Sequence, residues 1–315
     1  MNIKKLTALL CAVVMVLSLA ACGGSGDKAE NKHYTVGICQ LVQHDALDAA
    51  TKGFRDAITD ALGADNVTFD EQNAAGESAT CATIVNGFVS KGVDLIMANA
   101  TPALTAAVSA TADIPILGTS ITAYGVALDI DDFSGTVGGN VSGTSDLADL
   151  QKQAQMILDW LLFCSAEPNS RYQIDEVRKA LEAQGVTCEE FAFTDSNDVS
   201  SVTQKAADFS DVVYIPTDNT AASNTEAIAN VLIPAGVPAI CGEEGLCRGC
   251  GVATLSISYY DLGVTTGEMA AKILKGEANI SEMPVEYTDA TPKYNAPICD
   301  QLGITPLDGY EAIDG

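Results

Sequence analysis

The sequence predicts an α/β protein with two doubly wound lobes, each built on a mainly parallel sheet. From residue 34 onward, short runs rich in β-branched residues alternate with longer amphipathic stretches. Such alternation is typical of parallel strands joined by right-handed helical crossovers. The series occurs twice, and 119–145, a stretch rich in Gly, Ser, Thr and Asp without helical period, separates the two copies. We therefore place the lobe boundary in that stretch.

The first series begins with an apolar run at 34–41 and an amphipathic stretch at 45–62. In the latter, Leu47, Ala50, Phe54 and Ile58 fall on one helical face. Another helix is predicted to start at Thr101, a good N-cap residue followed by a proline in the first turn. The expected strands are 34–41, 67–70, 93–98 and 114–118, and the expected helices are 45–62, 79–91 and 101–111.

The second series repeats the pattern from residue 146 and ends in an irregular tail that contains prolines. Its apolar runs are again short and bounded by polar or turn-forming residues, as expected of buried strands. The expected helices are 146–159, 170–184, 199–209, 220–233 and 260–275, and the expected strands are 161–164, 186–191, 212–215, 237–241 and 252–256.

The first 22 residues are typical of a bacterial lipoprotein leader. Lys4 and Lys5 precede an apolar run of roughly 14 residues, too short to span a bilayer and suited to a signal-peptide core. Leu-Ala-Ala-Cys at 19–22 resembles a lipobox, whereas the alternative, a buried N-terminal helix, has no amphipathic partner. We expect 1–21 to be a signal peptide, Cys22 to carry the lipid, and 22–32 to be a flexible tether on the extracytoplasmic face.

Charge and motif content exclude several functions. The chain has 16 basic and 42 acidic residues, a formal net charge of −26, which disfavours nucleic acid. With 47% hydrophobic and 18% charged residues, most of it is globular. Its two histidines leave little scope for histidine catalysis, and Gly-x-Ser-x-Gly, Walker and His-Glu-x-x-His motifs are missing from the sequence. We expect no catalytic residue, no cofactor and no metal.

One cysteine cluster stands apart from the other thiols. Cys241, Cys247 and Cys250 lie within ten residues of each other. Three thiols without a nearby histidine are a poor zinc motif. Free thiols or one local disulfide are therefore the favoured interpretation, with a metal or redox site as the alternative.

Polar residues follow the predicted strands, where ligands bind in doubly wound sheets. Hydroxyls and amides dominate, several at predicted helix N-termini, so capping alone is the simpler explanation. Helix N-termini that converge from two lobes would bind a carboxylate without arginine, and Asp218, Glu167 or Glu243 would balance an ammonium. An amino acid fits this pattern, and so does a sugar. The segments are 43–44, 72–73, 99–102, 119–120, 165–170, 216–220 and 242–244.

These strand ends carry motifs that resemble ABC-transporter substrate-binding proteins of the tryptophan/tyrosine type, which have a type I periplasmic-binding-protein fold. The most specific pair is Asn-Val-Ser-Gly-Thr-Ser-Asp at 140–146 and Pro-Thr-Asp-Asn-Thr at 216–220. Matching pieces run in order from about Tyr34 to Lys275. A departure follows Thr119-Ser120, where Ile-Thr-Ala-Tyr-Gly replaces the family's Asp-Pro turn.

The resemblance implies a lipid-anchored receptor that captures an amino acid, most simply an aromatic one, and passes it to an ABC permease. It also implies a multi-strand hinge, with 33–119 plus 252–283 as the N-terminal lobe and 120–251 plus 284–315 as the C-terminal lobe. Thr119, Ser120 and Glu243 are added from strand-end position alone. The residues that the resemblance places at the ligand are His44, Thr101, Ser165, Glu167, Asn169, Ser170, Asp218 and Asn219.

In this interpretation a ligand that touches both lobes favours their closed arrangement. N-cap groups at Thr101 and 165–170 would bind its carboxylate and Asp218 or Glu167 its ammonium. Tyr124 or Tyr260 would line the side-chain slot, unless both serve ordinary packing. The alternatives are the same fold binding a sugar or nucleobase, a ligand-sensing module, and an enzyme.

Overall fold

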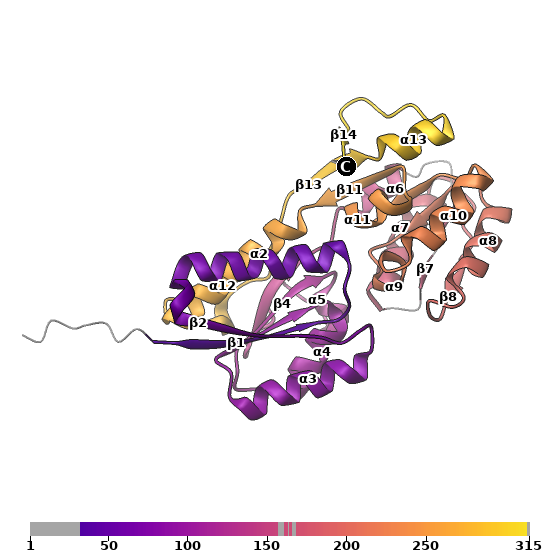
Figure 1. The fold of residues 1–315 in the computed structure, drawn as a ribbon. Helices are drawn as coiled ribbons and strands as arrows, with labels where there is room; N and C mark the ends of the chain where they lie inside the picture. The colour runs from indigo at the N-terminus through magenta and orange to yellow at the C-terminus, as the bar shows by residue number, and fades with distance from the viewer. Residues whose placement is uncertain (1–31, 157–160, 163, 166–167, 314–315) are drawn as a thin grey trace, which may run out of the picture. The chain divides into compact units, whose positions relative to one another are not determined.

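The computed structural model describes residues 32–156, 161–162, 164–165 and 168–313, and the chain from Tyr34 onward forms one compact unit. The predicted signal peptide, Cys22 and nearly all of the tether lie outside the described residues. Two six-stranded sheets, here called sheet A and sheet B, organise the unit (Figure 1). The predicted α/β class with two parallel-sheet lobes is confirmed.

Sheet A has the strand order β12-β5-β4-β3-β1-β2, and every neighbouring pair is parallel. The part that runs β2-β1-β3-β4-β5 is a common doubly wound order. The central strand β3 is buried along its whole length, as expected of a strand covered on both faces. The strands are β1 (Tyr34–Gln40), β2 (Val67–Asn73), β3 (Leu95–Asn99), β4 (Ile116–Ile121), β5 (Val141–Ser145) and β12 (Glu286–Tyr287).

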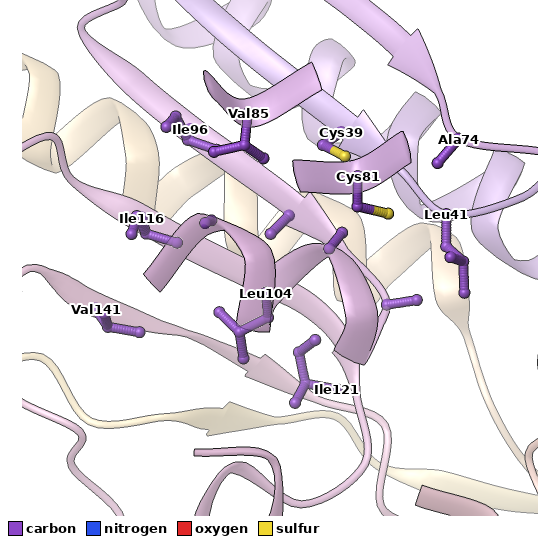
Figure 2. Packing of buried hydrophobic residues seen from close by; sticks show 14 of the residues in the cluster. Cys39, Leu41, Ala74, Cys81, Val85, Ile96, Leu104, Ile116, Ile121 and Val141 are labelled. Atoms are coloured by element: carbon purple, nitrogen blue, oxygen red, sulfur yellow. The ribbon is translucent and has the colours of Figure 1, made fainter. Parts of the chain in front are cut away.

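Two helix pairs supply the apolar cores of sheet A. Figure 2 shows one of these cores, in which Val85 and Leu104 from α3 and α4 pack with the strand residues Ile96 and Ile116. The other core joins α2 and α12 to a different set of strand residues. The helices of this part are α2 (Asp45–Leu62), α3 (Ser78–Lys91), α4 (Thr101–Ala110), α5 (Tyr124–Ala127) and α12 (Tyr259–Lys275), with 3₁₀ turns at Ala64–Asn66 and Ile280–Glu282.

Helices α2 and α12 are in backbone contact. A Cβ atom at Gly53 would lie 2.1 Å from the carbonyl oxygen of Tyr260, and one at Gly263 would lie 2.0 Å from that of Ala50. Both positions therefore require glycine, because any side chain would push the helices apart. Figure 1 shows the two helices side by side.

Sheet B has the order β14-β13-β11-β10-β9-β6. Its pairs are parallel except for β11 with β13, which is antiparallel. Strand β7 follows β6 along the chain and pairs with β8. The strands are β6 (Leu161–Leu162), β7 (Cys164–Ser165), β8 (Ala192–Phe193), β9 (Val213–Ile215), β10 (Ala239–Cys241), β11 (Ala253–Ile257), β13 (Ala290–Tyr294) and β14 (Glu311–Ala312).

The helices around sheet B form two further cores. Helices α8 and α10 share one with the strands, and α6, α7 and α13 share the other. Within the described residues, no helix is both long enough and apolar enough to cross a bilayer. The helices are α6 (Leu150–Met156), α7 (Pro168–Glu182), α8 (Val199–Phe209), α9 (Asn219–Ala222), α10 (Thr225–Ala235), α11 (Glu244–Cys250) and α13 (Ala296–Leu302).

The chain passes between the two sheets three times. It leaves sheet A between β5 and α6, returns between β11 and α12, and leaves again between β12 and β13. Strands β5 and β12 thus belong to sheet A, although the sequence assigned their ranges to the C-terminal lobe. Strand β5 was not predicted because its sequence, Val-Ser-Gly-Thr-Ser, has only one apolar residue. Its buried hydroxyl groups form hydrogen bonds with Thr119, Thr266 and backbone oxygens.

Three other elements differ from the sequence prediction. The helix expected at 220–233 is two helices, α9 and α10, divided at Ser223 and Asn224. The strand expected at 186–191 lies later, at β8, and the helix α11 was not predicted. Helix α11 is short and glycine-containing, so its sequence resembles a loop.

Candidate ligand-binding site

The carboxyl ends of strands from both sheets line one small cavity, here called the polar cavity. The space between atoms inside this lining is about 320 Å³, part of which is open solvent. Most of its lining consists of hydroxyl, amide and carboxyl side chains. The lining residues are His44, Leu47, Thr101, Ser120, Thr122, Asp146, Asn169, Thr217, Asp218, Asn219, Ala222, Glu243 and Tyr259.

The sheet A side of the polar cavity rests on two strained backbone positions. Ala100, directly before Thr101, has φ = 85°, and Ser120 at the end of β4 has φ = 56°. Non-glycine residues adopt this left-handed region at a cost of about 1–3 kcal/mol, and such residues cluster at functional sites. The Ser120 hydroxyl is buried and has no hydrogen-bond partner among the described residues. It is therefore available to a ligand.

On the sheet B side, Asp218 forms the N-cap of α9. Its Oδ1 accepts a hydrogen bond from the amide of Ala221 at 2.8 Å, and its Oδ2 accepts one from Ser170 Oγ at 2.6 Å. The neighbouring Asn169 donates Nδ2–H to the carbonyl of Thr217 at 2.8 Å. Its Oδ1 is buried and unpartnered within the described part of the chain. Asn169 thus offers the cavity an acceptor.

Glu243 follows β10 and forms the N-cap of α11. Its two oxygens accept hydrogen bonds from the amides of Leu246 at 2.5 Å and Gly245 at 2.6 Å. Burial raises the pKa of Glu243 to about 7, with the nearby acids Asp146 and Glu244 adding to the rise and the two amides opposing it. Its charge therefore changes near neutral pH.

Asp146 and Tyr259 lie where the chain crosses between the sheets. The Tyr259 hydroxyl donates to Asp146 Oδ2 at 2.7 Å, whereas Asp146 Oδ1 is buried without a hydrogen-bond partner. Burial raises the pKa of Asp146, while the Tyr259 hydrogen bond and the nearby Thr122 hydroxyl oppose the rise. Asp146 is only 4% exposed, and an unpaired carboxyl oxygen in a buried residue is costly unless a ligand or water binds it.

His44 precedes α2 and faces Asn219 across the cavity. Its Nε2 lies 3.4 Å from Asn219 Oδ1, which fits the tautomer with a proton on Nε2. Burial lowers the pKa of His44 more than Asn219 and the nearby aspartates raise it. The imidazole is therefore neutral at pH 7 and acts as a polar, uncharged contact.

The predicted site residues fall into three groups. Thr119 and Ser170 lie behind the cavity, where Thr119 contacts Thr144 at 3.2 Å and Ser170 supports Asp218. Ser165 ends β7, and Glu167 lies outside the described residues. The predicted residues that line the cavity are His44, Thr101, Ser120, Asn169, Asp218, Asn219 and Glu243.

The two predicted aromatic candidates lie elsewhere. Tyr124 is buried within the sheet A part, where its hydroxyl donates to the carbonyl of Gly118 at 3.0 Å. Tyr260 is 38% exposed and donates to Asp56 Oδ2 at 2.9 Å. The cavity is lined instead by Tyr259, because α12 turns the first of the two adjacent tyrosines inward.

Sequence reasoning also missed several lining residues. Asp146 and Tyr259 stand inside motifs that supported the family resemblance, so those motifs were the available signal. Thr122 directly follows β4, and Thr217 follows β9 by two positions. The apolar residues Leu47 and Ala222 belong to helices that were expected to pack on the core. The described residues contain no group of three or more His, Cys, Asp or Glu side chains arranged to hold a metal ion.

Sequence and structure comparisons place the chain in a known group. Residues 35–308 match the model of the family described as ABC transporter substrate binding protein. The chain belongs to this family. Its members are solute-binding proteins rather than enzymes, and they serve ABC transporters.

Two relatives of this substrate-binding protein have a named ligand. A "Tyrosine-binding protein" of Clostridioides difficile is 32% identical over 91% of this chain and 89% of its own. A Streptococcus pneumoniae ABC domain solved with L-Trp has a TM-score of 0.84 at 29% identity, covering 90% of this chain and 100% of that one. A ligand-free, open Clostridium difficile substrate-binding protein with adhesive properties has a TM-score of 0.67 at 32% identity, covering 89% and 99%.

Proposed function

We propose that this substrate-binding protein captures an aromatic amino acid, tryptophan or tyrosine, in the polar cavity and delivers it to an ABC permease. The observation that carries the proposal is the set of buried, unpartnered polar atoms that line one cavity: the Ser120 hydroxyl and the acceptors of Asp146 and Asn169. Buried polar groups normally have partners, so these groups are matched to a polar ligand. The ligands named for two relatives support an aromatic amino acid.

Each part of such a ligand has a counterpart in the cavity. The Ser120 hydroxyl and the first turn of α4 at Thr101 supply donors for the carboxylate. Buried carboxyl groups supply acceptors for the ammonium. Leu47, Ala222 and the ring of Tyr259 form the apolar part of the lining, against which an aromatic side chain packs.

We further propose that the protein acts on the extracytoplasmic side of the membrane, held there by lipid on Cys22. The apolar run and the lipobox-like Leu-Ala-Ala-Cys support this location. In cells fed labelled palmitate, the wild-type chain should become labelled and should enter the detergent phase on partitioning. Cys22→Ser should abolish both effects, and Cys11→Ser should abolish neither.

The ligand is tested by thermal unfolding and calorimetry on the chain without residues 1–22, which lie outside the compact unit. The screen covers the twenty amino acids, the nucleobases and a set of small sugars. Tryptophan or tyrosine at 100 times its Kd should stabilise the fold by about 2.7 kcal/mol. If a sugar or nucleobase stabilised the protein and no amino acid did, the ligand assignment would be wrong. The protein would still be a solute-binding protein.

A further inference from the structure

Three carboxyl groups reach the polar cavity, and only one of them has an oxygen left without a partner. Among the described residues that line the cavity, none is Lys or Arg, and the single imidazole is neutral. The three acids are Asp146, Asp218 and Glu243. Which of them receives a ligand cation depends on how many of their oxygens the protein already uses.

Asp218 and Glu243 are both occupied as helix caps. Each accepts a backbone amide on one oxygen, and the second oxygen accepts either the Ser170 hydroxyl or a second amide. These hydrogen bonds fix the starts of α9 and α11. A ligand ammonium would have to share or displace them.

Asp146 differs because its second carboxyl oxygen accepts no hydrogen bond from the described residues. Tyr259 occupies Oδ2 at 2.7 Å, and Oδ1 is buried with no hydrogen-bond partner in the part of the chain that the structure describes. Asn169 Oδ1 is a second buried acceptor in the same lining with no donor. An ammonium group has three N–H donors and a positive charge, which suits one carboxylate and one further acceptor.

We propose that Asp146 binds the ligand's ammonium group, that Tyr259 orients the Asp146 carboxylate, and that Asp218 serves as a cap. The proposal rests on the proposed function, since it assumes an amino acid ligand. It assigns the ammonium to a different residue from the three that the sequence suggested, Asp218, Glu167 and Glu243. It also explains why a buried aspartate is held with one oxygen unpaired.

A cycle that combines protein variants with ligand analogues tests the assignment. The ligands are L-tyrosine and L-tryptophan, each paired with its deamino analogue, 3-(4-hydroxyphenyl)propionate or 3-indolepropionate. The proteins are the wild type, Asp146→Asn and the matched control Asp300→Asn, whose side chain lies on the exposed side of α13. Calorimetry gives Kd for every pair, and circular dichroism confirms folding.

Asp146→Asn should weaken binding of the amino acid on the order of 100-fold, because one partner of a buried charge pair is lost. Binding of the deamino analogue should change by less than about threefold or improve, since no ammonium is present to lose its partner. Asp300→Asn should match the wild type with both ligands. Equal loss for both ligands, or no loss for either, would overturn the proposal.

Tyr259→Phe provides a second test should Asp146→Asn fail to fold. It keeps the ring and removes the hydroxyl that orients Asp146, so amino acid binding should weaken by about fivefold to tenfold while the deamino analogue is unaffected. Equal effects on both ligands would mean that the hydroxyl does not act through the ligand's ammonium group, and would contradict the proposal. Failure of the wild type to bind any amino acid would overturn the proposed function itself, before any variant is compared.

Discussion

The two walls of the polar cavity differ in charge and in what their polar atoms do. The sheet A wall has no ionised group: its polar members are His44, Thr101, Ser120 and Thr122. The sheet B wall carries the carboxyl groups of Asp218 and Glu243, both engaged as helix caps. The first wall thus offers the unpaired Ser120 hydroxyl at a strained position. The second offers the unpaired Asn169 oxygen and two charged groups that the fold already uses.

A carboxylate in the lining of a site is therefore not by itself a ligand contact. On the sheet B wall, the acids stabilise the starts of two short helices and so keep the wall in place. Among the described lining residues, the buried polar atoms without partners belong instead to uncharged side chains, Ser120 and Asn169, and to the crossing residue Asp146. Such atoms cost stability and are retained where function needs them. Substitutions of the sheet B acids should therefore mainly lower stability, whereas substitutions at Ser120 or Asp146 should mainly weaken ligand binding.

Removing Asp218 should have the largest effect on stability. Asp218→Ala removes the cap of α9 and leaves the buried Ser170 hydroxyl without its 2.6 Å acceptor. We expect the free energy of unfolding to fall by about 3 kcal/mol, from a lost cap and from a hydroxyl left with only the Thr217 carbonyl at 3.4 Å. Urea denaturation measures the change.

Asn279→Ala is the matched control for Asp218→Ala, because Asn279 caps the 3₁₀ turn at Ile280–Glu282 away from the cavity. It should cost about 1 kcal/mol. Equal losses for the two variants would show that the sheet B wall has no special structural role.

The stability of the unliganded protein should depend on pH through Glu243. Its folded pKa of about 7 exceeds the ordinary value of 4.5, so the folded state keeps a proton that the unfolded state loses between these values. Stability is therefore greatest below pH 4.5 as far as this group is concerned, and falls as pH rises through 7. From pH 5 to pH 8 the loss should be roughly 2 kcal/mol.

Denaturation at pH 5 and pH 8 measures this dependence, and Glu243→Gln should reduce it. Asp146, whose pKa burial also raises, contributes in the same direction and leaves a residual slope. The exposed Glu268→Gln on α12 is the control and should leave the profile unchanged. A profile that is identical in wild type and Glu243→Gln would contradict the assignment.

Relief of backbone strain at Ser120 should give the smallest change in stability, and it should stabilise the protein, whereas Asp218→Ala destabilises it. Glycine adopts φ = 56° without strain, so Ser120→Gly should raise the free energy of unfolding of the unliganded protein by about 0.5–1 kcal/mol. Ligand binding should weaken, since the hydroxyl donor is gone.

Ser120→Ala separates the two contributions at this position. It keeps the strained backbone and removes the hydroxyl, so its stability should stay within about 0.5 kcal/mol of wild type while its affinity falls as in the glycine variant. Loss of stability in Ser120→Gly would mean that the serine side chain supports the wall rather than the ligand.

The fold was predictable from the sequence because its elements are long and strongly patterned. Helix α2 has the predicted limits, and α8 does as well, since the apolar residues of both recur at helical spacing. Strand β5 was not predicted because its burial relies on small hydroxyl side chains with partners distant in sequence. No local pattern contains that information.

The site was predictable only as far as strand ends determine it. Residues such as Thr101 and Asp218 follow strands directly, and a doubly wound sheet brings such positions to one edge. Tyr259 could not be separated from Tyr260, because the choice depends on how α12 is rotated against α2. The idle oxygen of Asp146 depends on a hydrogen bond to a residue 113 positions away.

The backbone contact between α2 and α12 has a consequence for how the site responds to different ligands. His44 precedes the first helix and Tyr259 begins the second, and the two backbones touch at Gly53 and Gly263. The two lining residues therefore move together as parts of one block. A bulkier solute cannot be accommodated by shifting Tyr259 alone, so widening the pocket by evolution or design requires changes at both helices or truncation of the tyrosine itself.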